Sequence, residues 1–153
     1  MSMDRARAHL ARHALEERII EFEVSSATVA LAAQALGCEE ARIAKTLSFE
    51  SGEGALLVVA AGDARVDNAK FKQRFSMKAR MLSADRVEPL IGHGVGGVCP
   101  FGVNAGVPVY LDESLRRFDV VYPAAGTSAS AVRLTIDELE RASEAVGWVD
   151  VTK

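Results

Sequence analysis

Arg42-Ile43-Ala44-Lys45-Thr46-Leu47-Ser48-Phe49 has the alternation of a β-strand. Successive side chains of a strand point to opposite faces, so Lys45 shares a face with Ile43 and Leu47. This is the more apolar face, where an ammonium group is costly to bury without partners. Such a lysine either packs its aliphatic stem on the strand and reaches water at the rim with its ammonium group, or it lines a site. In a site, desolvation shifts its pKa, which suits it to catalysis. The spacing alone favours the first interpretation, whereas a glycine-rich loop further along the chain favours the second.

The surrounding sequence predicts a mixture of strands and helices. Ser51-Gly52-Glu53-Gly54 is typical of a hairpin turn, and the following run to Ala61 is apolar on both faces, which indicates a central buried strand. Gly37 is placed to end one helix, and Thr135 and Glu138 form a capping box that starts another. We expect helices over 3–16, 27–36, 67–75, 83–91 and from 135 to about 146, and strands over 18–24, 42–49, 55–61, 107–111, 118–122, 131–134 and 148–151. The order predicts an α+β fold with an antiparallel component, in one domain over 1–153.

A glycine-rich loop comes after the fourth predicted helix: Gly92-His93-Gly94-Val95-Gly96-Gly97-Val98-Cys99-Pro100-Phe101-Gly102. Glycine allows close backbone approach, so such a loop can present its N–H groups to a ligand. Three of its glycines match the dinucleotide-binding fingerprint, but that motif needs a strand before it and a helix opening within it. Here a short helix precedes the loop, and Pro100 prevents a helix from opening within it, so we predict no nucleotide cofactor, and no cofactor of any other kind.

Composition limits the classes of protein that fit. The chain has 153 residues, of which 49% are hydrophobic, and no apolar run approaches the ~20 residues that span a bilayer. With no signal peptide and only Cys38 and Cys99, we expect a cytoplasmic protein without a disulfide framework and without contact with a membrane. The cysteines and histidines lack a recognisable metal-ligand spacing, so no metal site is predicted. The net charge of −3 leaves nucleic-acid contact to a local patch, and the basic cluster at 65–80 is either that patch or a solvated helix face.

Several segments in order resemble the YbaK/ProX family of aminoacyl-tRNA deacylases. The lysine segment Ile43-Ala44-Lys45-Thr46-Leu47, the loop Gly97-Val98-Cys99-Pro100-Phe101-Gly102 and the stretch Ala124-Ala125-Gly126-Thr127-Ser128 carry the likeness, with Tyr110 to Leu115 between them. The resemblance implies a largely antiparallel, β-barrel-like sheet flanked by helices, without a metal. It also implies hydrolysis of the ester of a mischarged tRNA in trans, by a protein related to the editing domain that is inserted in bacterial prolyl-tRNA synthetases.

The resemblance also implies the site. Lys45 and Gly97 are the expected catalytic positions, the loop amides supplying an oxyanion site. Lys45 could orient the terminal adenosine or the ester, polarise the carbonyl or act as a base. The expected substrate-binding residues are His93, Val98, Cys99, Pro100, Phe101, Gly126, Thr127 and Ser128.

Alternatives remain open for several of these positions. His93 could equally be an exposed loop residue, and Cys99 could be a nucleophile, although a small pocket-lining side chain is favoured because no basic partner is close in sequence. Thr127 and Ser128 either contact the amino acid or form an ordinary polar turn. The expected partner is the acceptor end of a mischarged tRNA, with a synthetase such as prolyl-tRNA synthetase as a further partner. Alanine on proline tRNA is the first substrate to consider, before serine, threonine and 2-aminobutyrate. A non-catalytic aminoacyl-tRNA or amino-acid binding module, or a regulatory partner of a synthetase, would use the same fold.

Overall fold

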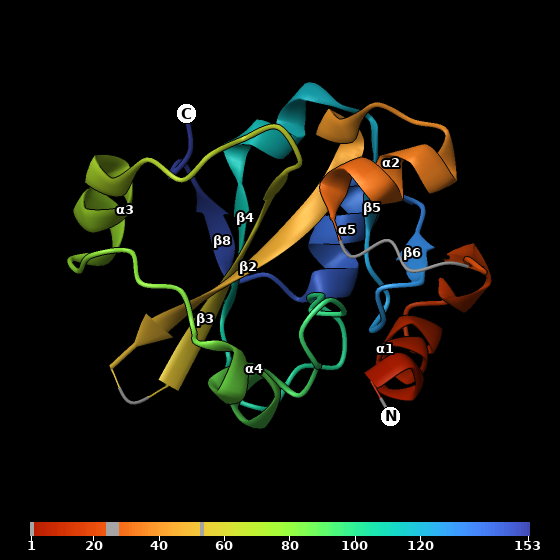
Figure 1. Cartoon of the computed structure of the whole chain (residues 1–153), viewed down its shortest axis with the longest axis horizontal. Helices are drawn as coiled ribbons and strands as arrows, with labels where there is room; N and C mark the ends of the chain where they lie inside the picture. The colour runs from red at the N-terminus through yellow and green to blue at the C-terminus, as the bar shows by residue number, and fades with distance from the viewer. Residues whose placement is uncertain (1, 24–27, 53) are drawn as a thin grey trace.

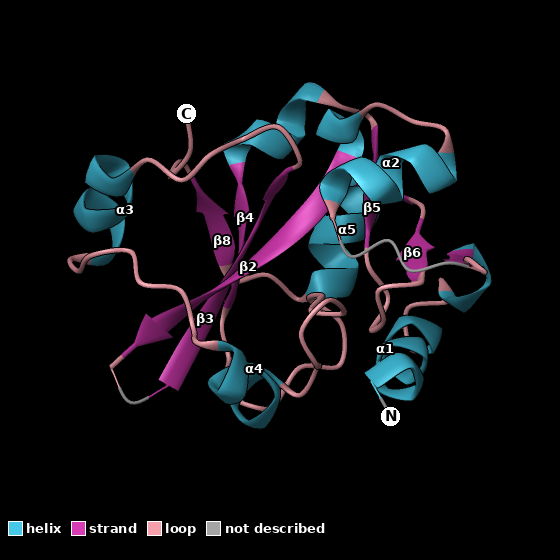
Figure 2. Ribbon diagram, viewed as in Figure 1, coloured by secondary structure: helices cyan, strands magenta, loops and turns pink. Residues whose placement is uncertain are grey.

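A computed structural model describes residues 2–23, 28–52 and 54–153 of the chain. A curled six-stranded sheet is flanked by helices, and a two-stranded ribbon lies apart from it (Figures 1 and 2). The strands are β1 (Ile19–Glu21), β2 (Ile43–Ser51), β3 (Gly54–Ala61), β4 (Val109–Asp112), β5 (Val120–Pro123), β6 (Ser130–Val132), β7 (Leu134–Thr135) and β8 (Gly147–Val149). The α-helices are α1 (Ser2–Ala11), α2 (Val29–Leu36), α3 (Asn68–Phe75), α4 (Ala84–Ile91) and α5 (Ile136–Ser143), with short 3-10 turns at Glu16–Arg18, Glu40–Arg42 and Glu113–Arg117. Within the described ranges, no helix is both long and apolar enough to cross a membrane.

The hairpin of β2 and β3 is the centre of the sheet, whose strand order is β7-β5-β2-β3-β4-β8. It pairs Lys45 with Ala60 and closes at Ser51 and Gly54, as the turn residues predicted. β5 pairs with β7, and β1 with β6, in antiparallel fashion. The pairs β2–β5, β3–β4 and β4–β8 are parallel, which requires long connections such as the one that carries α3 and α4 between β3 and β4. The predicted α+β class is confirmed, and the sheet is mixed.

Two apolar clusters lie on the two faces of the β2–β3 hairpin. One contains Leu57 and Val59 and buries side chains of α1, α4 and α5, among them Leu10, Ile91 and Leu139. The other contains Phe49, Leu56, Val58 and Phe71 of α3. β3 is buried on both faces, as its unbroken apolar run predicted. Lys45 belongs to the strand face of Phe49, whereas Thr46 and Ser48 belong to the opposite face.

The helix ends show where local sequence was sufficient. Gly37 ends α2 in the left-handed conformation, and Thr135 and Glu138 form the capping box of α5, so both predictions are confirmed. The predicted ends of two helices were wrong. α1 ends at Ala11, before the left-handed Ala14, and α5 ends at Ser143, because Glu144 takes a left-handed conformation with a φ of 54°. Two further boundaries were predicted at residues 24 and 27, which lie outside the described residues; among the described residues, β1 already ends at Glu21, and α2 starts at Val29, after its extended N-cap Thr28.

Candidate functional site

A cavity of about 370 Å³ lies between α2, β2, α4 and the loops that come after α4 and β5. Thr28 is the N-cap of α2: its hydroxyl accepts from the N–H of Leu31, and both Thr28 and Val29 line the cavity, so the helix starts there. The lining residues are Thr28, Val29, Ala32, Ile43, Ala44, Lys45, Thr46, Ser48, Met81, Leu82, Ala84, Val87, Val95, Gly96, Val98, Tyr122, Ala124, Thr127, Ser130 and Ala131. Most of these side chains are small or apolar. The volume is near the lower end of the range for small-molecule sites.

Lys45 is the one lysine, arginine, histidine or acidic residue among the described residues that line this cavity. Its side chain is half-buried, and its Nζ donates to the carbonyl oxygens of Gly62, at 3.3 Å, and of Ala64. Burial lowers the pKa of Lys45, while the nearby Asp63 carboxylate acts in the opposite direction. Both interpretations of the strand pattern therefore hold: the ammonium group reaches the end of β3, and the residue lines a cavity.

The hydroxyl groups of β2 also line the cavity, and the sequence interpretation missed them. Thr46 and Ser48 lie on the strand face opposite Lys45 and line the same cavity. The Oγ1 of Thr46 is buried and has no hydrogen-bond partner within the described residues. A buried hydroxyl without a partner costs about 1–3 kcal/mol, so this oxygen is available to a ligand. The signal was present in the sequence, since polar residues alternate with apolar ones along β2.

The glycine loop approaches the cavity through Val95, Gly96 and Val98. Gly97 does not line it. A Cβ at Gly97 would lie 2.3 Å from the carbonyl oxygen of Gly126, so the two loops touch through their backbones here. The N–H of Gly97 donates to the carbonyl of Gly94 at 3.0 Å, within the loop itself. The geometry therefore gives Gly97 a role in loop contact and leaves its amide engaged.

His93, Cys99 and Phe101 form a buried group behind the loop, and none of the three is solvent-exposed. The interpretation of His93 as an exposed residue was wrong: its Nε2 lies 2.5 Å from the carbonyl oxygen of Phe101 and 3.5 Å from the Sγ of Cys99. Burial raises the pKa of the Cys99 thiol to about 12, so a thiolate nucleophile is not available at neutral pH. Pro100 lines a different cavity, beside α1. These residues support the loop and are absent from the cavity wall.

The turn after β5 supplies the remaining wall. Thr127 lines the cavity, and Ser130 fixes the turn because its Oγ accepts from the N–H groups of Ala125 and Thr127. Ser128 lies beside Gly96: a Cβ added to Gly96 would be 3.4 Å from the Cβ of Ser128. Of the site residues that the sequence pointed to, Lys45, Val98 and Thr127 thus line one cavity.

The wall of the cavity lies within a recognisable family domain. The model of the aminoacyl-tRNA editing domain matches residues 23–142, which include every residue of the cavity wall. The chain belongs to this family. Membership makes it an aminoacyl-tRNA editing domain and implies aminoacyl-tRNA as its class of substrate.

Individual relatives match this editing domain over nearly its full length. "Uncharacterized protein YwhH" of Bacillus subtilis (strain 168) is 49% identical over 154 residues, which cover 100% of this chain and 98% of that protein. A solved structure described as "Crystal structure of a putative trans-editing enzyme for prolyl tRNA synthetase" superposes with a TM-score of 0.89 at 32% identity, covering 99% of this chain and 97% of that one. The hypothetical protein APE2540 superposes with a TM-score of 0.79 at 31% identity, covering 89% and 91% of the two chains. The curled sheet with its flanking helices is therefore the fold of the YbaK-like editing domains.

Proposed function

We propose that the protein is a deacylase that hydrolyses the ester of a mischarged aminoacyl-tRNA in trans, with a small amino acid, alanine on proline tRNA first, as its substrate. The observation that carries the proposal is the shared cavity: Lys45 of β2, Val98 of the glycine loop and Thr127 of the turn after β5 line one space. Among the described residues of its wall, the cavity has a single cationic side chain, which lies among hydroxyl and apolar groups. A cytoplasmic location is part of the proposal, since charged tRNA is used there.

The chemistry required is modest because the aminoacyl ester is already activated. A water molecule must be held against the carbonyl carbon, and the developing oxyanion must be stabilised. Within the described residues the N–H of Val98 makes no hydrogen bond, so this amide is a better oxyanion donor than the engaged N–H of Gly97. A single donor of this kind typically contributes about 10²–10³ in rate.

Lys45 supplies the positive charge of the site. Its Nζ already donates to two backbone carbonyls, which hold the ammonium group in place and oppose a role as a base. We infer that the charge orients the ester or the terminal adenosine, or polarises the carbonyl. Because burial lowers its pKa, the rate should fall at alkaline pH as Lys45 loses its proton, at a pH below the ordinary value of 10.5.

The preference for a small amino acid rests on the wall of the cavity. Ala32, Ala44 and Ala124 leave room for a short side chain, whereas the hydroxyls of Thr46 and Thr127 can bind the amine or a polar substituent. One methylene contributes only about 1–3 kcal/mol to discrimination in such a pocket, so serine, threonine and 2-aminobutyrate remain competitors in the test.

An exposed basic segment leads to the cavity and suits the phosphates of an acceptor stem. The side chains of Lys72, Arg74, Lys78 and Arg80 are exposed, and Met81, directly after Arg80, lines the cavity. Residues 80–82 are fixed along β2 through hydrogen bonds of Glu50 with Arg80 and of Leu82 with Ser48. Since phosphate contacts give salt-dependent affinity without reading sequence, the choice of tRNA is left to the acceptor end or to a synthetase partner.

The test is a panel of tRNAs charged with alanine, serine, threonine, 2-aminobutyrate or the cognate amino acid. Loss of the amino acid is followed with the wild type, with Lys45→Ala and with Lys153→Ala, which removes an exposed lysine that does not line the cavity. We expect Lys45→Ala to reduce deacylation at least 10²-fold while the melting temperature changes little, and Lys153→Ala to match the wild type. Full activity of a folded Lys45→Ala variant on every tRNA would remove the lysine from the mechanism. Tight binding by the wild type without any loss of amino acid would favour the non-catalytic binding module.

A further inference from the structure

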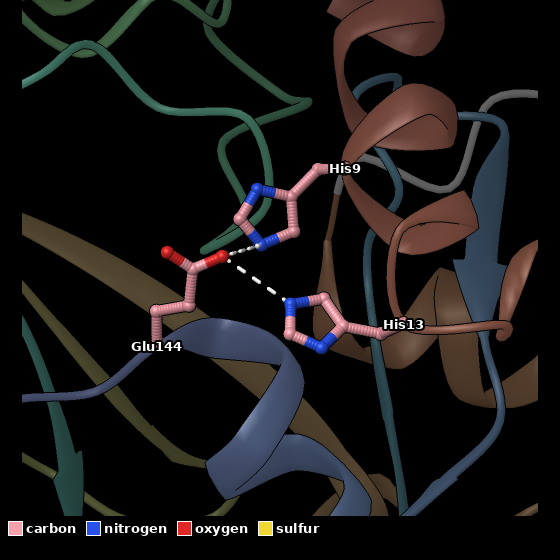
Figure 3. A group of neighbouring side chains, drawn as sticks. All are labelled: His9, His13 and Glu144. Atoms are coloured by element: carbon pink, nitrogen blue, oxygen red, sulfur yellow. Dashed lines mark hydrogen bonds and ion pairs between the residues drawn. The ribbon is translucent and has the colours of Figure 1, made fainter.

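Two histidines and a glutamate meet where the end of α1 faces the end of α5. His9 lies on α1, His13 comes two residues after that helix, and Glu144 is the residue that ends α5. Figure 3 shows both imidazole rings with a nitrogen directed at the same carboxylate oxygen. None of the three lines the editing cavity, and all three lie outside the span 23–142 of the family domain. The cluster is therefore separate from the site described above.

The distances between the potential ligand atoms suit a metal ion. Glu144 Oε2 lies 3.3 Å from His9 Nε2 and 3.2 Å from His13 Nε2, and the three atoms all lie within 4.8 Å of one another. Ligand atoms about 2.0–2.1 Å from a tetrahedral zinc ion are about 3.3 Å apart, so the two measured edges need almost no adjustment. We propose that His9, His13 and Glu144 form a binding site for a divalent cation of the zinc class. Two imidazoles and one carboxylate are a ligand set that this class of ion prefers.

The surroundings leave a free coordination position and a route to it. A second cavity, of about 550 Å³, is lined by His9 and Glu144 together with Arg5, Pro100 and Ser143. Three protein ligands beside an open cavity leave the fourth position to water, as in zinc sites that are not closed by protein on all sides. His9 is held in place from behind, because its ring packs against Phe101 with ring centroids 5.9 Å apart. A cation would tie α1 to α5, since its ligands come from both.

Arg12 competes with a cation for the place beside His9 and Glu144. Its Nη2 lies 3.0 Å from His9 Nδ1 and 3.6 Å from Glu144 Oε2, so a guanidinium group occupies the place of a cation beside the cluster. Because arginine only donates, His9 Nδ1 accepts here, and the ring proton is on Nε2, which donates to the carbonyl of Ala142 at 2.6 Å. A cation at Nε2 requires this proton to move to Nδ1 and Arg12 to turn away. The Arg12 side chain is 68% exposed and free to do so.

Because Arg12 competes with the cation, removing Arg12 and removing a ligand should change the affinity for Zn²⁺ in opposite directions. The full chain, stripped with a chelator, is titrated with Zn²⁺ alone in a competition assay against a chromophoric chelator, and Co²⁺ is used separately for its visible spectrum. The variants are His13→Gln and Glu144→Gln, which each remove one ligand, and Arg12→Gln, which removes the competing charge and offers a carbonyl oxygen to the Nδ1–H of His9. Glu140→Gln is the matched control, because Glu140 lies on the same helix and bonds to Trp148 instead.

We expect one Zn²⁺ per chain, a melting temperature that rises with Zn²⁺, and the intense visible absorption of four-coordinate Co²⁺. His13→Gln and Glu144→Gln should each weaken Zn²⁺ binding at least tenfold, Arg12→Gln should tighten it several-fold, and Glu140→Gln should match the wild type. Saturable binding that His13→Gln and Glu144→Gln leave intact would overturn the proposal, as would the absence of binding by both the wild type and Arg12→Gln. Neither result depends on deacylation, so the outcome is independent of the proposed function.

Discussion

The Cys99 thiol illustrates how burial decides the chemistry of a single residue. It is fully buried between His93 and the carbonyl of Phe101, and burial raises its pKa to about 12. The closeness of a histidine suggests a nucleophilic pair, but this histidine is itself buried, and burial lowers its pKa, so no imidazolium is available to stabilise a thiolate. Position in the fold therefore outweighs the proximity of the two side chains.

We predict that alkylation distinguishes the two cysteines of the folded protein. Iodoacetamide at pH 8 should modify Cys38, which is partly exposed, and leave Cys99 unmodified until the protein unfolds. Peptide mass spectrometry after native and denaturing labelling measures both sites. Because burial also raises the pKa of Cys38, its reaction should be slow compared with that of a free thiol. Rapid labelling of Cys99 under native conditions would contradict the burial described above.

At the scale of single residues, the sequence was sufficient to identify Lys45, because the two-residue alternation of side chains along a strand can be recognised from neighbouring residues. It did not locate the Thr46 hydroxyl as a cavity group, because the cavity takes residues from both faces of β2. The contact of Glu144 with His13 could not be predicted from the sequence, for a different reason. Glu144 stands 131 residues after His13, and only the packing of α5 against α1 brings the two together.

Among the elements, the glycine loop depends on one close backbone contact. Gly97 is buried against the carbonyl of Gly126, and its own N–H closes a turn onto Gly94. The two loops that this contact joins both contribute to the cavity wall, through Val98 and Thr127. A side chain at position 97 would separate them, since a backbone oxygen cannot rotate away as a flexible side chain can.

We predict that Gly97→Ala damages the protein and that Gly94→Ala does not. An added Cβ at Gly97 would lie 2.3 Å from a backbone oxygen, whereas at Gly94 the nearest atom is a Glu88 side-chain oxygen at 3.9 Å. Overpacking of this kind typically costs about 1–3 kcal/mol. Urea unfolding should show that loss for Gly97→Ala alone, and deacylation should fall with it because Val98 moves. Equal stability of the two variants would mean that the loop contact is not tight.

The ends of the elements show what local sequence can predict. The capping box of α5 and the left-handed Gly37 were predictable, because each is made by residues within one turn. The end of α5 was not, because nothing in the residues after Ser143 forces Glu144, rather than a glycine, into the left-handed conformation. In the same way, the parallel pairing of β4 with β3 and β8 depends on long crossovers, which leave no signature within the strands themselves.

At the scale of the whole molecule, Asp112 joins the sheet to the end of the chain. It is fully buried at the end of β4; its Oδ1 accepts from the N–H of Val151, and its Oδ2 accepts from the N–H of Ser114 and the hydroxyl of Thr152. The same terminal segment pairs with residues 65–67, through Lys153 with Arg65 and Val151 with Asp67. The carboxylate thus fastens residues 151 and 152 to the end of β4, while backbone hydrogen bonds hold the same segment against the connection between β3 and α3.

We predict that Asp112→Asn destabilises the protein far more than Asp150→Asn does. Three groups donate hydrogen bonds to the Asp112 carboxylate. The NH₂ group of asparagine would face one or two of these donors, leaving buried polar groups unsatisfied and lowering the free energy of unfolding by about 2–4 kcal/mol. Asp150 offers the matched control, because it is exposed and pairs only with Lys70, at 3.1 Å, within the described residues, so its loss should cost less than about 1 kcal/mol. Urea unfolding of both variants measures the difference, with an unchanged slope indicating that the unfolding reaction is the same. Equal midpoints for the two variants would show that the terminal segment is not held through Asp112, and that the sheet is stable without it.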